Sequence, residues 1–115
     1  MTSLPFWEDW NCVRLYIRSR LLAFCGVHPT ARGPLKAWIK EVESAHWETP
    51  HEIRARFRSA DFVGGERIVF NIGGNKFRLI VRIVYASKAH DLGGILFIRF
   101  IGTHEEYDAV DAATV

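Results

Sequence analysis

The hydrophobic period of the chain changes once, near residue 66, and this change restricts the possible folds more than any other feature. Residues 67–72 (RIVFNI) and 76–85 (KFRLIVRIVY) largely alternate between two sets of side chains with a period of two, which is typical of half-buried strands. The GGN sequence between them accepts positive φ angles and predicts a tight turn. Residues 95–101 (ILFIRFI) predict one more strand. The C-terminal half therefore predicts a small antiparallel sheet that begins with a hairpin.

The N-terminal half carries mainly helical signals. Residues 12–18 alternate like a first strand, and Ser19 can cap a helix that stops before Pro29. Residues 28–34 (HPTARGP) predict a loop. A second helix is expected to begin after Pro34, a favourable early position. Its apolar residues fall on one stripe at helical spacing: Leu35, Trp38, Ile39 and Val42.

Two capping boxes predict where further helices begin. Thr49 and Glu52 bracket Pro50, a favourable first helical residue, whereas Thr103 and Glu106 predict a short acidic helix near the C-terminus. The order of a strand, several helices and three consecutive strands predicts an α+β protein. Its helices should pack on one face of the small antiparallel sheet and leave the second face partly open.

Length and composition indicate a single cytoplasmic domain. The 115 residues suffice for one domain, which we expect to span residues 11–115, with residues 1–10 as an N-terminal extension. The two cysteines, Cys12 and Cys25, make no disulfide framework and fit a reducing compartment. No apolar run reaches the length of a membrane span, and the N-terminus lacks the pattern of a signal peptide.

Charge is distributed unevenly along the chain. Residues 54–82 carry seven Arg and Lys against two acidic residues, whereas residues 103–115 carry four acidic residues and no Arg or Lys. A basic middle next to an acidic tail suggests a site for an anion, with nucleic acid as the first candidate. The alternative is a solvated face whose charges have no specific ligand.

Strand alternation predicts a cationic second face of the sheet. Lys76, Arg78 and Arg82 share one face of the strand at 76–85. In the last strand, simple alternation places Arg99 on a face with Ile95, Phe97 and Ile101. If the two faces coincide, the second side of the sheet is a cationic floor with apolar residues between the charges. The alternative is a row of solvent-facing arginines, which is usual for half-exposed antiparallel sheets.

His104 and Tyr107 follow the last strand and would border this floor. RNA cleavage needs groups that take a proton from the 2′-hydroxyl and return one to the 5′-oxygen, and cations that stabilise the phosphorane without a metal. Arg78, Arg99, His104 and Tyr107 have side chains suited to these tasks. His104 and Tyr107 also have structural interpretations, as a strand-end histidine and as a core residue of the terminal helix.

Other chemistries find less support in the sequence. The histidines at 28, 46, 51, 90 and 104 show no paired metal-ligand spacing, so we predict no metal site and no cofactor. The glycines lie between strands, whereas a phosphate loop needs them between a strand and a helix. No serine or cysteine occupies a nucleophile elbow. Asn71 and Asn75 are candidates to contact a base or ribose, with turn and sheet-edge roles as the alternative.

Four stretches between about Val13 and Val115 resemble, in order and spacing, the HigB family of toxins from type II toxin–antitoxin systems: HPTARGPLKAW, SAHWETPHEIRARFRSAD, RIVFNIGGNKFRLIVRIVY and IRFIGTHEEYDAVDAATV. The resemblance implies a RelE-like fold and a ribosome-dependent mRNA endonuclease active in the ribosomal A site. It also implies a HigA-type antitoxin with a helix-turn-helix, which blocks the toxin and helps repress the operon, so that operator DNA is bound only through the antitoxin.

By this resemblance, the catalytic residues correspond to Arg78 in FRLIV, His104 in GTHEEYD and Tyr107, and within the closer family to Arg99 in IRFIG. We assign to RNA or ribosome contact a second set: Lys76, Arg82, Asn71, Asn75 and Arg58. The chain departs from the family in its first ten residues and in a longer loop at 86–94. The alternative function is a non-catalytic RNA- or ribosome-binding module, or an inactive toxin that acts in operon regulation with its antitoxin.

Overall fold

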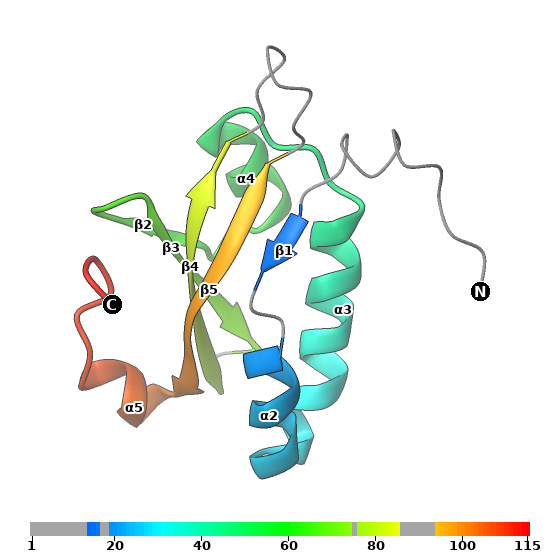
Figure 1. Ribbon diagram of the computed structural model, residues 1–115, viewed down its shortest axis with the longest axis vertical. Helices are drawn as coiled ribbons and strands as arrows, with labels where there is room; N and C mark the ends of the chain where they lie inside the picture. The colour runs from blue at the N-terminus through cyan, green and yellow to red at the C-terminus, as the bar shows by residue number, and fades with distance from the viewer. Residues whose placement is uncertain (1–13, 17–18, 75, 86–93) are drawn as a thin grey trace.

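The computed structural model describes residues 14–16, 19–74, 76–85 and 94–115, and within them the chain forms an α+β fold (Figure 1). The described strands make one five-stranded sheet in the order β1-β5-β4-β3-β2. Their bounds are β1 Arg14–Tyr16, β2 Asp61–Val63, β3 Arg67–Ile72, β4 Phe77–Val84 and β5 Ile95–Thr103. The expected N-terminal extension at 1–10, Asn75 and residues 86–93 of the long loop lie outside the described residues.

The predicted hairpin is the centre of the sheet. β3 and β4 pair antiparallel from Arg67 opposite Arg82 to Ile72 opposite Phe77. The turn between them uses Gly73 and Gly74 at φ of 66° and 68°, a region that glycine enters without steric cost. β2 and β5 extend the antiparallel pairing on either side, and β1 joins the outer edge of β5 in parallel. β2 was not predicted, because three residues are too few to show a period.

The described helices are α2 Ser19–Val27, the 3₁₀ helix η1 Pro29–Ala31, α3 Arg32–Glu43, α4 Pro50–Arg56 and α5 His104–Asp108. The predicted loop at 28–34 is wrong, since these residues form η1 and the first turn of α3. Pro29 and Pro34 both stand in first turns, where a missing backbone N–H costs no intrahelical hydrogen bond. α3 therefore begins two residues before Pro34.

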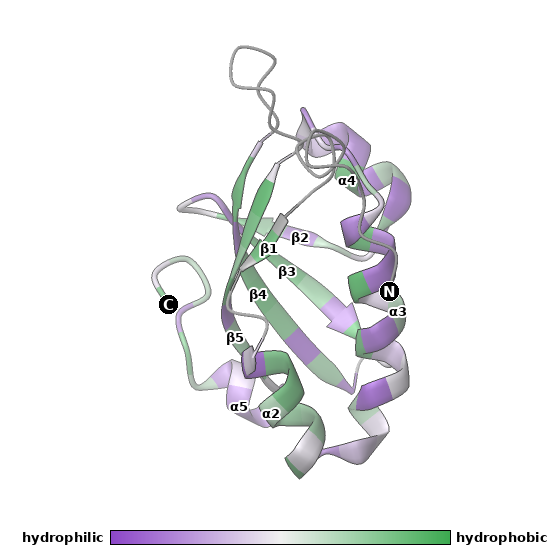
Figure 2. Cartoon of the chain, turned by 45° about the vertical axis from the view of Figure 1, so that its right-hand side comes forward, coloured by the Kyte–Doolittle hydropathy of each residue, from purple (hydrophilic) through white to green (hydrophobic). Residues whose placement is uncertain are grey.

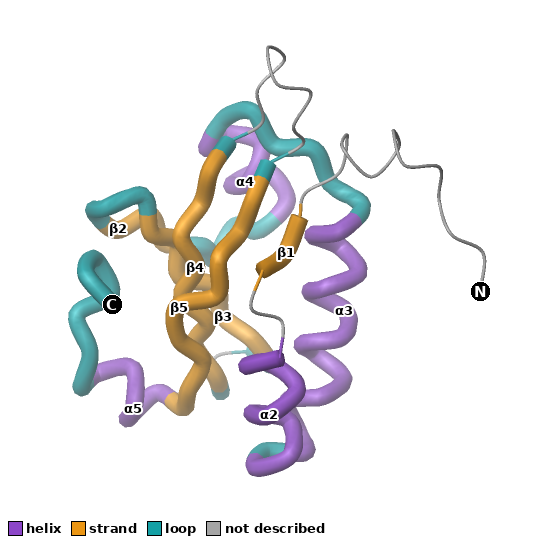
Figure 3. The backbone as a smooth tube through the Cα atoms, viewed as in Figure 1, coloured by secondary structure: helices purple, strands orange, loops and turns teal. Residues whose placement is uncertain are grey.

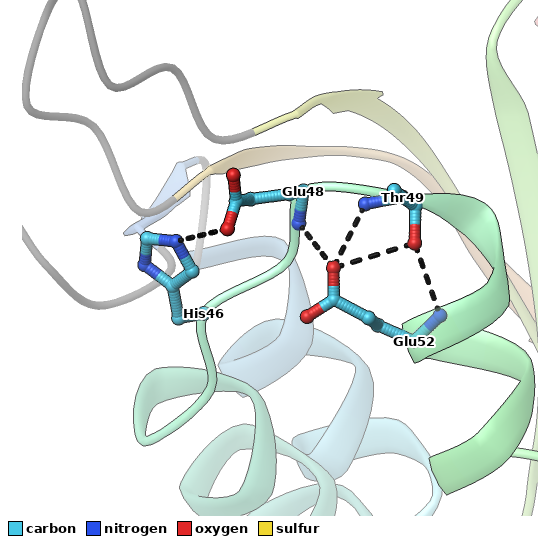
Figure 4. Close-up of polar contacts among 4 residues, drawn as sticks. All are labelled: His46, Glu48, Thr49 and Glu52. Atoms are coloured by element: carbon cyan, nitrogen blue, oxygen red, sulfur yellow. Dashed lines mark hydrogen bonds and ion pairs between the residues drawn. The ribbon is translucent and has the colours of Figure 1, made fainter.

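The predicted capping box at the start of α4 is confirmed (Figure 4). The Glu52 carboxylate accepts hydrogen bonds from the backbone N–H groups of Glu48 (3.0 Å) and Thr49 (3.1 Å). The Glu52 N–H in turn donates to the Thr49 hydroxyl at 3.4 Å. His46 and Glu48 lie 3.5 Å apart just before the helix. This network ends the preceding loop and sets the direction in which α4 enters the core.

The core lies between the sheet and α2, α3 and α4. Phe70 of β3 is fully buried and packs edge-on against Trp38 and Phe57, with ring centroids 5.3 and 5.0 Å away. Leu21 and Ile53 contribute to the same buried cluster from α2 and α4. Figure 3 shows α3 on one side of the sheet and α5, with the C-terminal residues, on the other. Among the described residues, α5 and the residues after it lie on the second face of the sheet (Figure 3).

Candidate functional site

Arg78 points away from the core helices α2, α3 and α4. Its neighbours Phe77 and Leu79 are buried in the core on the helix side, so strand alternation places Arg78 on the second face, where it is half-buried. Asn71 lies directly opposite it on β3, and Gly102 lies opposite it on β5. Arg78 therefore stands between an amide side chain and a residue with no side chain.

Three side chains meet around Arg78. Its guanidinium donates a hydrogen bond to Asn71 Oδ1, and its Nη2 lies 2.6 Å from His104 Nε2. The Tyr107 ring centroid is 5.7 Å from Arg78 Cζ, within cation–π range. Asn71 Nδ2 also donates to the Ser59 carbonyl at 3.3 Å. Asn71, Arg78, His104 and Tyr107 form the group hereafter named the Arg78 cluster.

The contact with Arg78 favours one tautomer of His104. A guanidinium is only a donor, so Nε2 of His104 must accept, and the imidazole is then neutral with its proton on Nδ1. The ring is exposed, so its Nε2 faces both Arg78 and the solvent side of the sheet. The basic nitrogen of His104 is therefore directed to the same place as the guanidinium.

α5 brings His104 and Tyr107 to Arg78 together. His104 is the first residue of the helix and Tyr107 lies three residues on, so both project from one face. The Thr103–Glu106 capping box fixes the start: the Thr103 N–H donates to Glu106 Oε1 at 2.8 Å, and the Glu106 N–H donates to the Thr103 hydroxyl at 3.3 Å. The capping signal read from the sequence thus also orients the imidazole.

Gly102 has a role that the sequence reasoning missed. It is buried on the same sheet face as Arg78, and a Cβ there would lie 2.5 Å from the Phe100 ring and 3.0 Å from Glu106 Oε1. The position therefore has no room for a side chain beside Phe100 and the capping carboxylate. The one available signal was that a glycine breaks an apolar strand immediately before the cap.

Arg99 lies elsewhere, because β5 contains a bulge. Ile80 pairs with Phe100 and Val81 pairs with Ile98, which leaves Arg99 as the extra residue. Simple alternation along the strand is therefore wrong beyond Ile98, and Ile101 packs against the helix-side core. Arg99 lines a pocket beside α2, and within the described residues its buried Nε has no hydrogen-bond partner.

The residues expected to contact RNA lie at different distances from the cluster. Lys76 is exposed in the hairpin turn, two residues before Arg78, and exposed Arg58 precedes the Ser59 carbonyl that holds Asn71. Arg82 is four residues along β4, roughly 13 Å away at strand spacing, and pairs with Glu66 at 3.6 Å. Between the two arginines, Ile80 is fully buried. Asn75 lies outside the described residues.

The described residues contain neither a metal-ligand group nor a membrane-spanning helix. In residues 14–16, 19–74, 76–85 and 94–115, no three His, Cys, Asp or Glu side chains are grouped so that they could hold a metal ion. In the same part of the chain, no helix is both long enough and apolar enough to cross a membrane.

The comparison with protein families agrees with the fold. Residues 31–110 match the family described as the RelE-like toxic component of a toxin–antitoxin system. The α+β fold described above is consistent with this class of toxin, as the sequence predicted. More particularly, the chain belongs to the HigB toxin family, because the match covers well over half of its 115 residues and includes the whole Arg78 cluster. A search among curated proteins found no match.

Proposed function

We propose that this HigB-family toxin is a ribosome-dependent mRNA endonuclease and that the Arg78 cluster is its active site. The observation that carries the proposal is the 2.6 Å approach of Arg78 Nη2 to His104 Nε2 on the sheet face opposite α2, α3 and α4. It supports the proposal because a guanidinium fork binds phosphate oxygens and a neighbouring imidazole nitrogen can exchange a proton, so both groups would act on one phosphodiester. Membership of a toxin family supports the proposal, since a toxic component must interfere with an essential process and message cleavage would do so.

The cluster suits transesterification of RNA. In this reaction the 2′-oxygen forms a bond to the adjacent phosphorus, the bond from phosphorus to the 5′-oxygen breaks, and a 2′,3′-cyclic phosphate and a 5′-hydroxyl result. His104 would take the 2′-hydroxyl proton on Nε2, or in its protonated form return a proton to the leaving 5′-oxygen. Arg78 would hold the non-bridging oxygens as charge builds on the phosphorane.

The resting contact between Arg78 and His104 has a defined role in this scheme. Before RNA binds, the guanidinium occupies the lone pair of Nε2. A phosphate is a stronger acceptor for Arg78, because the hydrogen bond then joins two charges. Binding of the scissile phosphate would therefore draw the guanidinium away and release Nε2 for the proton. Tyr107 would assist proton transfer or stack on a base next to the cleaved bond.

The surroundings of the cluster supply the contacts to message and ribosome. Lys76 and Arg58 are exposed and lie close in the chain to Arg78 and Ser59, so we assign them to phosphates of the mRNA or the ribosomal A site. Arg82 and Arg99 are placed farther off and would act on flanking nucleic acid rather than on the scissile phosphate. A HigA-type antitoxin with a helix-turn-helix would oppose the toxin and bind operator DNA.

The test is to map message ends with and without translating ribosomes, using wild-type chain and the variants His104→Ala and Arg78→Ala. We expect cleavage only with ribosomes, cyclic-phosphate ends, and a fall of at least about 100-fold in both variants. Lys40→Ala, which removes an exposed charge from α3, should cut like wild type. Unchanged cleavage by both site variants would refute the assignment. Harmless expression of the wild type with intact messages would instead support a non-catalytic binding module.

A further inference from the structure

The surface of α2 is unusually apolar for an outward-facing helix. Leu22 and Val27 are 68% and 74% exposed and are the large apolar side chains that the described residues leave open to solvent. The helix has no acidic residue, and Arg20 is its single basic one. Figure 2 shows α2 coloured as hydrophobic over most of its visible length, whereas α3 beside it alternates with hydrophilic residues. An exposed apolar ridge of this kind usually marks an interaction surface.

A groove runs between α2 and α3. Leu21, Leu22 and Cys25 line it from α2, and Leu35 and Ile39 line it from α3, around a volume of about 440 Å³. Two exposed cations of α3, Arg32 and Lys36, border it. No acidic side chain is among its described lining residues. The groove therefore combines an apolar floor with an unbalanced positive edge.

A second groove lies on the opposite flank of α2, against the edge of β5. Phe24 and Val27 face Phe100 and Ile101 across about 400 Å³. Its cations are Arg20, which donates to the Arg99 carbonyl at 3.0 Å, and Arg99 itself. Within the described residues, the buried Nε of Arg99 has no acceptor. Both flanks of the helix thus present apolar side chains next to positive charge.

We infer that α2 and its two grooves form the docking surface for a segment of the antitoxin whose apolar side chains are flanked by carboxylates. The apolar ridge of Leu22 and Val27 would be covered by apolar side chains of the partner. A nucleic acid, whose outer surface is a charged backbone, has no such side chains. The cations on both flanks would meet acidic residues of the partner. A second copy of the chain docked face to face would instead oppose like charges. The inference rests on membership of a toxin–antitoxin family and is independent of the cleavage chemistry.

The wild-type chain provides the first test through Cys25, which is half-buried in the α2–α3 groove. The rate of alkylation by N-ethylmaleimide, followed by mass spectrometry of the Cys25 peptide, is measured with and without the antitoxin encoded by the adjacent gene. We expect at least about a tenfold slower reaction in the complex, because a docked segment excludes the reagent. An unchanged rate in a stable complex would refute docking in this groove.

The second test uses the double variants Leu22→Gln/Val27→Gln and Arg32→Glu/Lys36→Glu, with Ala37→Ser on the exposed side of α3 as control. Titration calorimetry with the antitoxin should show at least about tenfold weaker binding for each double variant and wild-type binding for the control. Equal affinity in all four proteins would overturn the inference. A dimer of the chain alone that the Leu22→Gln/Val27→Gln variant abolishes would overturn it in favour of self-association.

The same variants test the docking surface and the proposed endonuclease activity separately. None of the substituted residues belongs to the Arg78 cluster, so both double variants should cleave message like wild type while resisting the antitoxin. Loss of cleavage in His104→Ala with retained antitoxin binding would support both assignments. Normal antitoxin binding by the α2 variants, with cleavage lost in His104→Ala, would refute the docking surface alone.

Discussion

Arg78 Nη2 and His104 Nε2 lie 2.6 Å apart although they are separated by 26 residues in the chain. The contact joins the middle of the sheet to the first residue of the terminal helix. It makes the guanidinium the donor and the imidazole the acceptor, so each holds the other in place before any ligand binds.

The tautomer of His104 should be observable directly. Nitrogen-15 NMR of the neutral imidazole should show the proton of His104 on Nδ1, because a guanidinium can only donate to Nε2. Arg78→Ala should shift the ring toward the mixture of tautomers found in a free imidazole. His46, which lies just before α4 and is 3.5 Å from Glu48, is the internal reference. A predominant Nε2-protonated form in the wild type would contradict the contact.

Asn71 is expected to act as a positioning residue. It holds Arg78 through Oδ1 and is itself held by the Ser59 carbonyl. Asn71→Ala should lower the cleavage rate by about 10- to 100-fold with little change in message binding, because the guanidinium loses its orientation rather than its charge. Arg78→Lys should lower the rate for the related reason that an ammonium lacks the planar fork. A fall in binding alone, at an unchanged rate constant, would argue that Asn71 contacts RNA instead.

The two capping boxes provide a matched pair of variants. Thr49→Ala and Thr103→Ala each remove a hydroxyl that accepts from the third residue of its helix, so each should cost about 1 kcal/mol of unfolding free energy. Only Thr103→Ala should also reduce cleavage, since α5 carries His104 and Tyr107. Denaturant unfolding and the message assay separate the two effects. Equal cleavage by both variants would show that the α5 cap does not orient the imidazole.

Tyr85 should make stability depend on alkaline pH. Burial raises the pKa of its phenol above the ordinary value of 10.0, although the nearby Arg54 lowers it and Glu66 adds a small increase. The folded chain therefore keeps this proton to higher pH than the unfolded chain. The resulting stability is fully present below pH 10.0 and is lost as the pH rises through the folded pKa.

Urea unfolding at several pH values from neutral to strongly alkaline measures this dependence. Tyr85→Phe should flatten the decline above pH 10.0, because the replacement side chain has no proton to lose. A parallel decline in wild type and variant would assign the pH dependence to other groups.

Much of the fold follows from local patterns. The period of two at 67–72 and 76–85, with glycines between them, specifies the hairpin, since residues that alternate can bury only one face of a strand. Thr49 and Thr103 mark the first residues of α4 and α5 correctly because a cap is a contact within four residues. Arg78 was likewise placed on the face away from the helices by the alternation of its neighbours Phe77 and Leu79.

The errors also have physical causes. The loop predicted at 28–34 became helical because prolines in a first turn are compatible with either conformation. Arg99 was placed by simple alternation, but a bulge between Ile98 and Phe100 shifts the register, and a bulge depends on pairing with β4 rather than on β5 alone. β2 was missed because its pairing with β3 gives three residues a strand conformation that they do not signal themselves.

The sequence by itself determined the α+β class, the hairpin, the caps of α4 and α5, and the resemblance to the HigB toxins. Each of these depends on residues close together in the chain or on their order along it. Only the tertiary structure decided that Asn71, Arg78, His104 and Tyr107 meet, that Arg99 turns toward α2, and that α2 leaves its apolar ridge uncovered. These outcomes depend on strand register and on the packing of distant segments, which the periodicity of a single segment does not contain.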